Sequence, residues 1–146
     1  MAGFSFELNM DKAMRGLDIA MQKAQRSPEF MDTMGETLVS STHQHFKDGV
    51  GPDGKKWKTS QRASKEGGQT LVDSARLRNA VTYEATSQMV VIGVNAVYAR
   101  IHQLGGKTGR GLKVEMPARP YIYINDEDRA EIRALAVAEM KSMFGA

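Results

Sequence analysis

Hydrophobic and polar positions divide the chain into short strands and amphipathic helices. Residues 4–8 alternate apolar and polar side chains, which is the period of a half-buried strand. Between residues 10 and 24, apolar side chains recur at helical spacing and predict a helix with one buried face. A second helix is predicted from Ser27, which precedes Pro28 and an acidic residue, to the stop at Gly49. The short connection between these helices predicts an antiparallel helical hairpin.

The middle of the chain predicts a small antiparallel sheet. Residues 80–85 and 89–93 are two strand-like runs joined by a loop of hairpin length. The second run is almost entirely apolar, so we expect it to lie centrally and to be covered on both faces. A third strand is predicted over residues 119–124, with Pro120 near its start, where a missing amide donor is tolerated.

Two further helical segments flank this sheet. Before it, we expect Leu77 to be the main buried side chain of a short segment whose first turn Asp73 or Ser74 caps. At the end of the chain, Asn125 or Asp126 is expected to cap a helix with an acidic first turn. Its apolar stripe is predicted at helical spacing over Ile132, Leu135, Ala136, Glu139 and Met143.

These elements predict an α+β fold in a single domain over residues 1–146. It consists of a small, mainly antiparallel sheet packed with an N-terminal helical hairpin and a C-terminal helix. The 41% hydrophobic and 25% charged fractions are those of an ordinary globular protein. The chain has no cysteine, which excludes disulfides and thiolate metal sites, and no signal peptide or membrane-spanning run is apparent. We expect a soluble protein without cofactors.

The segments Tyr98–Gly106 and Met116–Tyr121 are the most distinctive part of the sequence. The first ends in two glycines, which can adopt positive φ, and the second contains two prolines, which fix φ and remove amide donors. Between them, residues 107–113 hold two more glycines, three cations and a single bulky apolar residue. We therefore predict a mobile basic loop near residues 105–115, held between two stiff ends.

A second mobile loop is predicted near residues 48–70, where turn-forming and polar residues predominate. Trp57 lies within it, beside a Gly/Pro turn. Such a tryptophan usually anchors its loop on the core, with the indole N–H donating to a carbonyl. A contact with another subunit is the main alternative, and base stacking is a more remote one.

Five short pieces of the sequence follow one another in a recognisable order. They are Pro52-Asp53-Gly54…Trp57, Leu71-Val72-Asp73-Ser74-Ala75-Arg76-Leu77-Arg78, Val91-Ile92-Gly93, Tyr98-Ala99…His102-Gln103…Gly105-Gly106 and Pro117-Ala118-Arg119-Pro120. Together they resemble the phage virion morphogenesis family, the tail-completion proteins of contractile-tailed phages and related prophages. The family usually has glycine where this chain has Ala75, so the turn before Arg76 departs from the family pattern.

The resemblance implies a structural protein of the phage neck or tail end, without catalysis. It implies a ring, with six copies as the expected number, that joins the tail tube or sheath to the head connector; a head-closure role is the alternative. Cyclic rings join two different patches of each subunit. We predict that one patch is residues 98–121, with contacts from Tyr98, Arg100, His102, Gln103, Lys107, Arg110, Arg119 and Tyr121.

Charge is distributed unevenly, although the net charge is only +3. Residues 47–65 and residues 100–120 carry the cationic excess, and acids gather near residues 126–131. Ordinary solvated loops account for this pattern, but sequence-independent DNA binding is an alternative function. A ring that lines a DNA channel would also carry mild positive charge. The candidate channel residues are Lys55, Lys56, Lys58 and Lys113.

No motif in the sequence predicts an enzyme or a metal site. His43 and His45 are two positions apart and would point to different sides of a helix, which is poor geometry for one metal ion. No acidic partner accompanies them or His102 at ligand spacing. We expect His102 to bond backbone at the double-glycine turn or a neighbouring subunit.

Overall fold

The computed structural model describes residues 3–9 and 27–144. The helix predicted between residues 10 and 24, which is the first half of the predicted hairpin, lies outside the described residues. The described elements are β1 (Phe4–Asn9), α3 (Pro28–Asp48), α4 (Gln61–Glu66), α5 (Arg76–Asn79), β2 (Val81–Ala85), β3 (Met89–Val94), α6 (Ala99–Leu104), β4 (Gly106–Thr108), the 3-10 helix η1 (Arg110–Leu112), β5 (Val114–Met116) and α7 (Asp126–Phe144).

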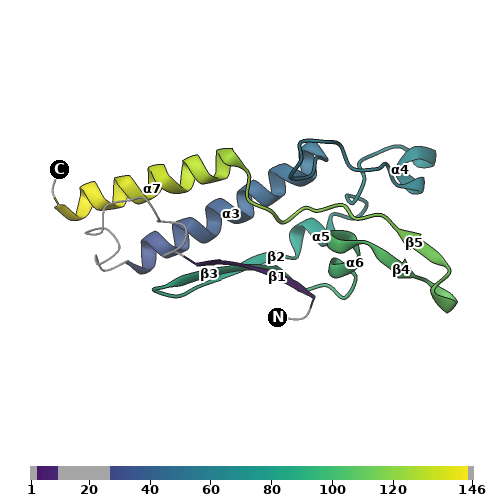
Figure 1. Ribbon diagram of the computed structural model, residues 1–146, viewed down its shortest axis with the longest axis horizontal. Coiled ribbons are helices and arrows are strands. Elements are labelled where there is room, and N and C mark those ends of the chain that lie inside the picture. Colours follow the sequence, from purple (N-terminus) through teal and green to yellow (C-terminus); the bar gives the residue numbers. More distant parts are fainter. Residues whose placement is uncertain (1–2, 10–26, 145–146) are drawn as a thin grey trace.

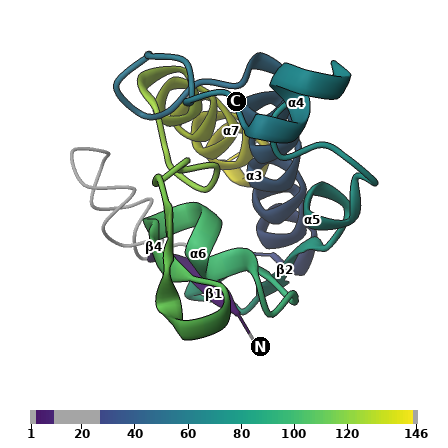
Figure 2. The same ribbon diagram turned by 90° about the vertical axis from the view of Figure 1, so that its right-hand side faces the viewer.

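A three-stranded antiparallel sheet forms one layer of the molecule, and α3 and α7 form the other (Figure 1). The strand order is β1-β3-β2, so β3 is central, as the sequence predicts. Phe4 of β1 and Val81 of β2 both lie opposite Val94 of β3. Helix α3 packs across β2 and β3, and α7 runs along α3 (Figures 1 and 2). The predicted α+β class, with a small antiparallel sheet and a C-terminal helix, is confirmed.

Helix α3 begins and ends where the sequence predicts. The side-chain oxygen of Ser27 accepts a hydrogen bond from the amide of Phe30 at 3.1 Å, and Gly49 ends the helix with φ of 64°. Gly35 lies directly against the ring of Tyr83, since a Cβ there would be 2.1 Å from a ring carbon. The missing side chain therefore lets α3 sit close to the sheet.

Strand β3 supplies the centre of the core. Val90, Ile92 and Val94 are fully buried on the face that meets α3, whereas Met89 and Val91 are half-buried. Both faces of the strand are thus covered at least in part, as predicted, and the face towards α3 is covered more completely. Burial of such apolar surface is the main favourable term in folding. The remaining core residues are Phe30, Met31, Met34, Leu38, Phe46, Trp57, Leu77, Val81, Ala99, Tyr121, Ile122, Ile132 and Ala136.

The predicted third strand over residues 119–124 is wrong. The segment is extended but lies in neither sheet. Its backbone groups bond side chains instead of a neighbouring strand. The indole of Trp57 and the imidazole of His45 each donate to a carbonyl of the segment, at 3.0 and 2.8 Å. The side-chain amide of Gln103 satisfies three more of its backbone groups. A strand-like sequence pattern does not reveal whether an extended backbone will hydrogen-bond a neighbouring strand or side chains.

Helix α7 begins with a reciprocal cap. The amide of Asp128 donates to the side chain of Asn125 at 2.8 Å, and the amide of Asn125 donates to the side chain of Asp128 at 3.0 Å. Asn125 is therefore the cap, one of the two residues predicted. Ile132 and Ala136 of the predicted stripe are buried, and Leu135 packs partly buried beside them.

The predicted cap at Asp73 or Ser74 is wrong, although Leu77 is buried as expected. Helix α5 begins after Ala75, whose φ of 58° is in the left-handed region, and no side chain caps it. Alanine is strained there because its Cβ approaches the following carbonyl. This is the position where the sequence departs from the glycine of the related family. The departure thus has a local structural cost.

Replacing Ala75 with glycine is expected to raise the free energy of unfolding by about 0.5–1 kcal/mol. The change relieves left-handed strain of about 1–2 kcal/mol, which outweighs the smaller cost of the greater conformational entropy that glycine gives the unfolded chain. Thermal denaturation measures the shift. The matched control is Ala138→Gly, on an exposed part of α7, which should destabilise by about 1 kcal/mol. Destabilisation by both substitutions would contradict the strain assigned to Ala75.

Candidate functional site

The segment predicted as a mobile basic loop forms a projecting hairpin. We call residues 97–116 the arm; it comprises α6, β4, η1 and β5. Strands β4 and β5 are antiparallel, with Lys107 opposite Glu115, and η1 forms the tip between them. Figure 1 shows the hairpin extending from one end of the molecule, away from both layers. After Tyr98 the chain forms the short helix α6.

Gly105 fixes the base of the arm. Its φ is 70°, and a Cβ at this position would lie 2.7 Å from the amide nitrogen of Ala118 and 2.9 Å from the carbonyl oxygen of Met116. Any side chain would therefore force the end of α6 away from the returning backbone. The amide of Arg119 also donates to the carbonyl of His102 at 2.8 Å. The double glycine predicted as a turn thus closes the arm onto itself.

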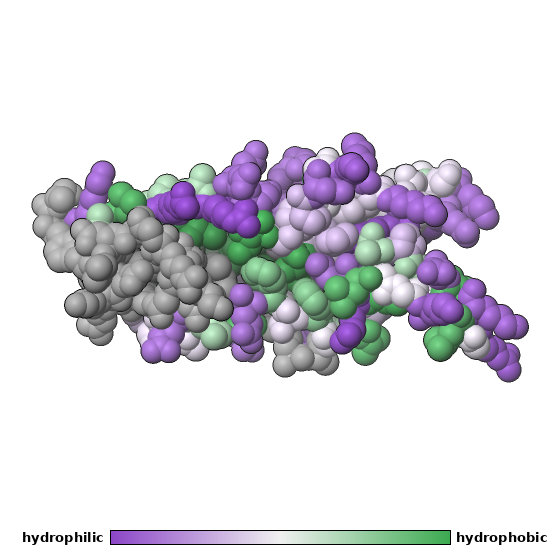
Figure 3. Space-filling view, viewed as in Figure 1, coloured by the Kyte–Doolittle hydropathy of each residue, from purple (hydrophilic) through white to green (hydrophobic). Residues whose placement is uncertain are grey.

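The arm carries an unusual concentration of exposed apolar surface. Among the described residues, every large hydrophobic side chain classed as exposed lies in it; Leu112 at the tip is 64% exposed. Exposed cations surround these side chains on the hairpin, and Figure 3 shows apolar and charged groups adjoining at this end. Exposed apolar residues gathered in one place mark interaction surfaces. The exposed set is Val97, Tyr98, Leu104, Leu112 and Val114, and the hairpin cations are Lys107, Arg110 and Lys113.

The structure divides the predicted interface residues into two groups. Tyr98, Arg100, Lys107 and Arg110 are exposed on the arm, and His102 is half-buried. The other group is buried and makes contacts within the subunit: Gln103, Arg119 and Tyr121. That these three contact a neighbour stays a prediction; their burial means that little of each side chain lies on the subunit surface. Sequence analysis did not assign four exposed apolar residues of the arm to the interface: Val97, Leu104, Leu112 and Val114.

Gln103 holds the base of the arm to the extended segment that precedes α7. Its side-chain oxygen accepts from the amides of Tyr121 and Ile122, both at 3.1 Å, and its nitrogen donates to the carbonyl of Ile122 at 2.9 Å. The Tyr121 hydroxyl in turn donates to the carbonyl of Ala99 at 2.8 Å. Burial raises the pKa of Tyr121 well above its usual range, so the phenol stays neutral and keeps donating.

Beside the arm lies a pocket of about 280 Å³, which we call the arginine pocket. Arg119 forms its floor with 4% exposure, and its Nε donates to the carbonyl of Lys58 at 2.7 Å. Burial lowers the pKa of Arg119, but a guanidinium remains protonated in proteins. The residues lining the pocket are Ser60, Arg62, Leu71, Asp73, Ser74, Ala75, Arg76, Leu77, Tyr98, His102, Met116 and Arg119.

His102 lines this pocket. Sequence analysis predicted that its ring bonds backbone or a neighbouring subunit, and within the described residues the ring bonds no backbone group. Its Nδ1 is buried without a hydrogen-bond partner in the described part of the chain. Burial, and to a smaller extent the nearby charge of Arg119, lowers the pKa of His102. The ring is therefore neutral at neutral pH. Tyr98 meets it edge to face, with ring centroids 6.0 Å apart.

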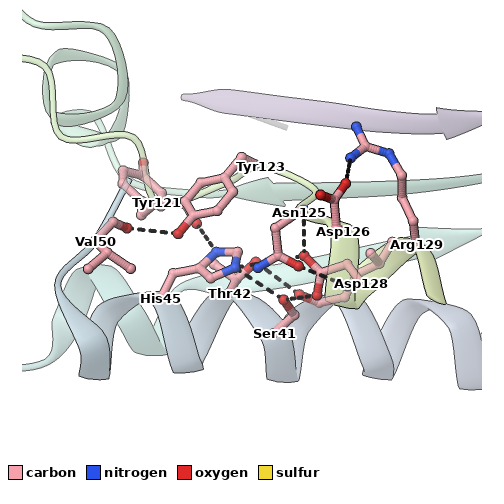
Figure 4. A network of polar contacts seen from close by, with 11 residues as sticks. Ser41, Thr42, His45, Val50, Tyr121, Tyr123, Asn125, Asp126, Asp128 and Arg129 are labelled. Atoms are coloured by element: carbon pink, nitrogen blue, oxygen red, sulfur yellow. Dashed lines mark hydrogen bonds and ion pairs between the residues drawn. The ribbon is translucent and has the colours of Figure 1, made fainter. Parts of the chain in front are cut away.

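A buried polar network lies between α3 and the start of α7 (Figure 4). His45 stacks on Tyr123, with ring centroids 3.8 Å apart, and its Nε2 faces the Ser41 hydroxyl at 3.2 Å and the Asp128 carboxylate at 3.8 Å. The Ser41 hydroxyl also donates to Asp128. Burial, and to a smaller extent the charge of Asp128, raises the pKa of Tyr123 to about 12. The Tyr123 hydroxyl donates to the Val50 carbonyl.

The residue types in this network are those of a hydrolytic triad, but the geometry is different. In a triad, the acid orients the histidine through the ring nitrogen that faces away from the serine. Here both Ser41 and Asp128 face Nε2 of His45, while Nδ1 donates to the Tyr121 carbonyl at 2.8 Å. Sequence analysis found no acidic partner for His45 at metal-ligand spacing; Asp128 reaches it only through the tertiary fold. The network ties α3 to the start of α7.

The candidate DNA-channel residues lie on two separate segments. Lys55, Lys56 and Lys58 are exposed around Trp57, and Lys113 is exposed on the hairpin. Trp57 itself is buried, and its indole donates to the Pro120 carbonyl at 3.0 Å, the contact expected of a loop anchor. In residues 3–9 and 27–144, no group of three or more metal-ligating side chains is placed to hold an ion, and no helix is long and apolar enough to cross a membrane.

Replacing Gln103 with leucine is expected to destabilise the protein by about 3 kcal/mol or more, because three buried backbone groups lose their partner. Chemical denaturation measures the loss. The control is Gln44→Leu, which removes an exposed bond to Asp48 and should change stability by less than about 0.5 kcal/mol. Similar effects of the two substitutions would refute the role assigned to Gln103.

Comparison with known proteins identifies relatives along almost the whole chain. A family model described as the phage virion morphogenesis family matches residues 8–141. The "Mu-like prophage FluMu G protein 2" of Haemophilus influenzae is 39% identical over 114 residues, which cover 78% of both chains. The "Putative capsid assembly protein G" of Escherichia phage Mu is 27% identical over 88% of this chain and 90% of its own length. No solved structure matches significantly. The chain belongs to the phage virion morphogenesis family, and its role is structural.

Proposed function

We propose that the protein is a tail-completion subunit, which forms a ring at the head-proximal end of the tail and joins the tail tube or sheath to the head connector. Family membership supports a role in virion morphogenesis. The observation that carries the proposal is the arm: exposed apolar side chains at one projecting end suit a contact made on assembly.

Ring formation uses the arm as one of two unlike contact surfaces. In closed cyclic symmetry each subunit presents one patch to the copy ahead and another to the copy behind. The hairpin projects from one end of the body (Figure 1). Its cations add electrostatic attraction to an acidic surface, which selects the partner and its orientation. Six copies are the expected number.

The isolated subunit leaves apolar side chains of the arm exposed to water. Full burial of a leucine or valine side chain contributes about 1.5–3 kcal/mol relative to exposure. Leu112 and Val114 are at least half exposed, so an interface that covers the tip recovers a large part of that amount. The base of the arm is already held by buried hydrogen bonds. Assembly therefore covers the tip, while the base needs no rearrangement.

A head-closure protein of the neck is the second candidate function. The relative from phage Mu bears the name of a putative capsid assembly protein, which favours a place closer to the head. The same arm would serve either ring, because both require contacts between copies. Electron microscopy of particles lacking the protein separates them. Unjoined full-length tails with ragged ends indicate tail completion, and heads that leak DNA indicate head closure.

Replacing residues 107–113 with a short Gly/Ser linker is expected to abolish head–tail joining while the protein still folds. The linker removes the exposed tip but leaves Gln103 and its bonds in place. Electron microscopy of the assembled particles gives the readout. The control exchanges Arg133 and Lys141, two exposed cations of α7, for serine. Normal tails joined to heads in the linker variant would contradict the proposed role of the arm.

DNA binding by the isolated protein is expected to be weak and to depend steeply on salt, because it would rest on phosphate contacts alone. Titration of a labelled duplex at low and moderate salt measures it. Replacement of Lys55, Lys56, Lys58 and Lys113 by glutamine should reduce the binding seen at low salt. A protein that binds no duplex even at low salt has no DNA-binding function, and the ring proposal then stands without a DNA-lined channel.

A further inference from the structure

Arg119 is a buried cation without a carboxylate partner in the described chain. Its side chain is 4% exposed, and the only bond recorded for it there runs from Nε to the Lys58 carbonyl. Ion pairs within the described residues join other groups. Charged side chains are rarely buried unless they are paired, because desolvation is costly. The two terminal nitrogens of Arg119 are therefore free to bind an anion at the floor of the arginine pocket.

The walls of the pocket strengthen this reading. Arg76 lies on the rim, and Arg62 is already paired with Asp73 at 3.7 Å, so the one acid in the lining is engaged. The buried Nδ1 of His102 also lacks a partner among the described residues. Two guanidinium groups without an ion-pair partner among the described residues, those of Arg76 and Arg119, thus line about 280 Å³ of space. A guanidinium fork matches the two oxygens of a carboxylate.

Three of the sequence pieces that carry the family resemblance converge on this pocket. Arg76 begins α5, Tyr98 precedes α6, His102 lies in α6, and Arg119 lies between the two prolines. Their separation in sequence and closeness in the fold indicate a built site and not a chance hollow between loops. The arm borders the site through Tyr98, His102 and Met116.

We propose that the arginine pocket receives a carboxylate side chain from a second copy of this chain, an assignment that rests on the ring proposed above. The burial of Arg119, which is 4% exposed, favours a side chain over DNA, because a glutamate carboxylate extends on a flexible stem whereas a phosphate is fixed to the duplex backbone. The exposed Arg76 on the rim guides the approaching acid.

The same chain supplies suitable carboxylates on a different surface. A groove of about 510 Å³ between α3 and the start of α7 is lined by several acids and by no lysine or arginine. Glu127 and Glu131 are exposed on α7 there. The donor surface and the receiving pocket come from different elements, so the contact between them is heterologous and can repeat around a ring. Charge complementarity thus assigns the acidic end of α7 as the donor.

Sedimentation of the purified full chain over a range of concentrations tests the assignment. Arg76→Glu and Arg119→Lys are expected to weaken self-association at least tenfold, as is the double variant Glu127→Gln with Glu131→Gln. The control is Lys141→Glu, which replaces a cation with an anion as Arg76→Glu does. Lys141 is exposed and does not line the pocket, so this variant should leave association unchanged. Thermal denaturation checks the folding of each variant. If Arg119→Lys does not fold, Arg76→Glu carries the test, since its side chain is exposed.

The outcomes separate the pocket from the ring. Association that is unaffected by the pocket variants overturns the carboxylate site and leaves the ring proposal intact. Association that falls with the pocket variants but not with the Glu127 and Glu131 exchanges overturns α7 as the donor. A chain that stays monomeric at every concentration overturns both the ring and the pocket contact. Loss of duplex binding by Arg76→Glu, with self-association unchanged, identifies a phosphate site and overturns the proposal.

Discussion

The extended segment over residues 119–124 depends on side chains for its backbone hydrogen bonds. A buried backbone group without a partner is costly, and this segment crosses the core without a neighbouring strand. Gln103 reaches it from α6, His45 from α3 and Trp57 from the loop after α3. Three parts of the chain that are distant in sequence are therefore held to one segment. The positions of the arm, of α7 and of the arginine pocket all follow from this arrangement.

The same arrangement explains why the most distinctive residues divide into two roles. Those that face inward hold the base of the arm: Gln103 bonds the segment, Tyr121 fills the core and Gly105 lets two backbones meet. Those that face outward, such as Leu112 and Lys107, have few contacts within the subunit. A rigid base with an exposed tip suits a protein whose partner is met during assembly, because little order has to be created when it binds.

Charge follows the same separation. The arm and the arginine pocket gather cations at one end, and the groove between α3 and α7 gathers acids. Within the groove, the buried His45 and Asp128 and the half-buried Ser41 hydrogen-bond one another and the start of α7, so they stabilise the fold. The exposed acids beside them have no such role. Opposite charges on unlike surfaces favour head-to-tail contact between copies over contact between identical surfaces.

Local chemistry in the sequence determined the elements of this protein. Ser27 caps the start of α3, Gly49 caps its end, and Asn125 caps the start of α7. The apolar run of β3 places that strand at the centre of the sheet. These features could be predicted because capping and burial patterns act over a few residues. Tertiary structure alone decided the rest. It paired residues 119–124 with side chains, buried Arg119 and Tyr121, and brought Asp128 to His45. Such contacts join residues far apart in the chain, and their burial depends on what packs over them, which no local pattern records.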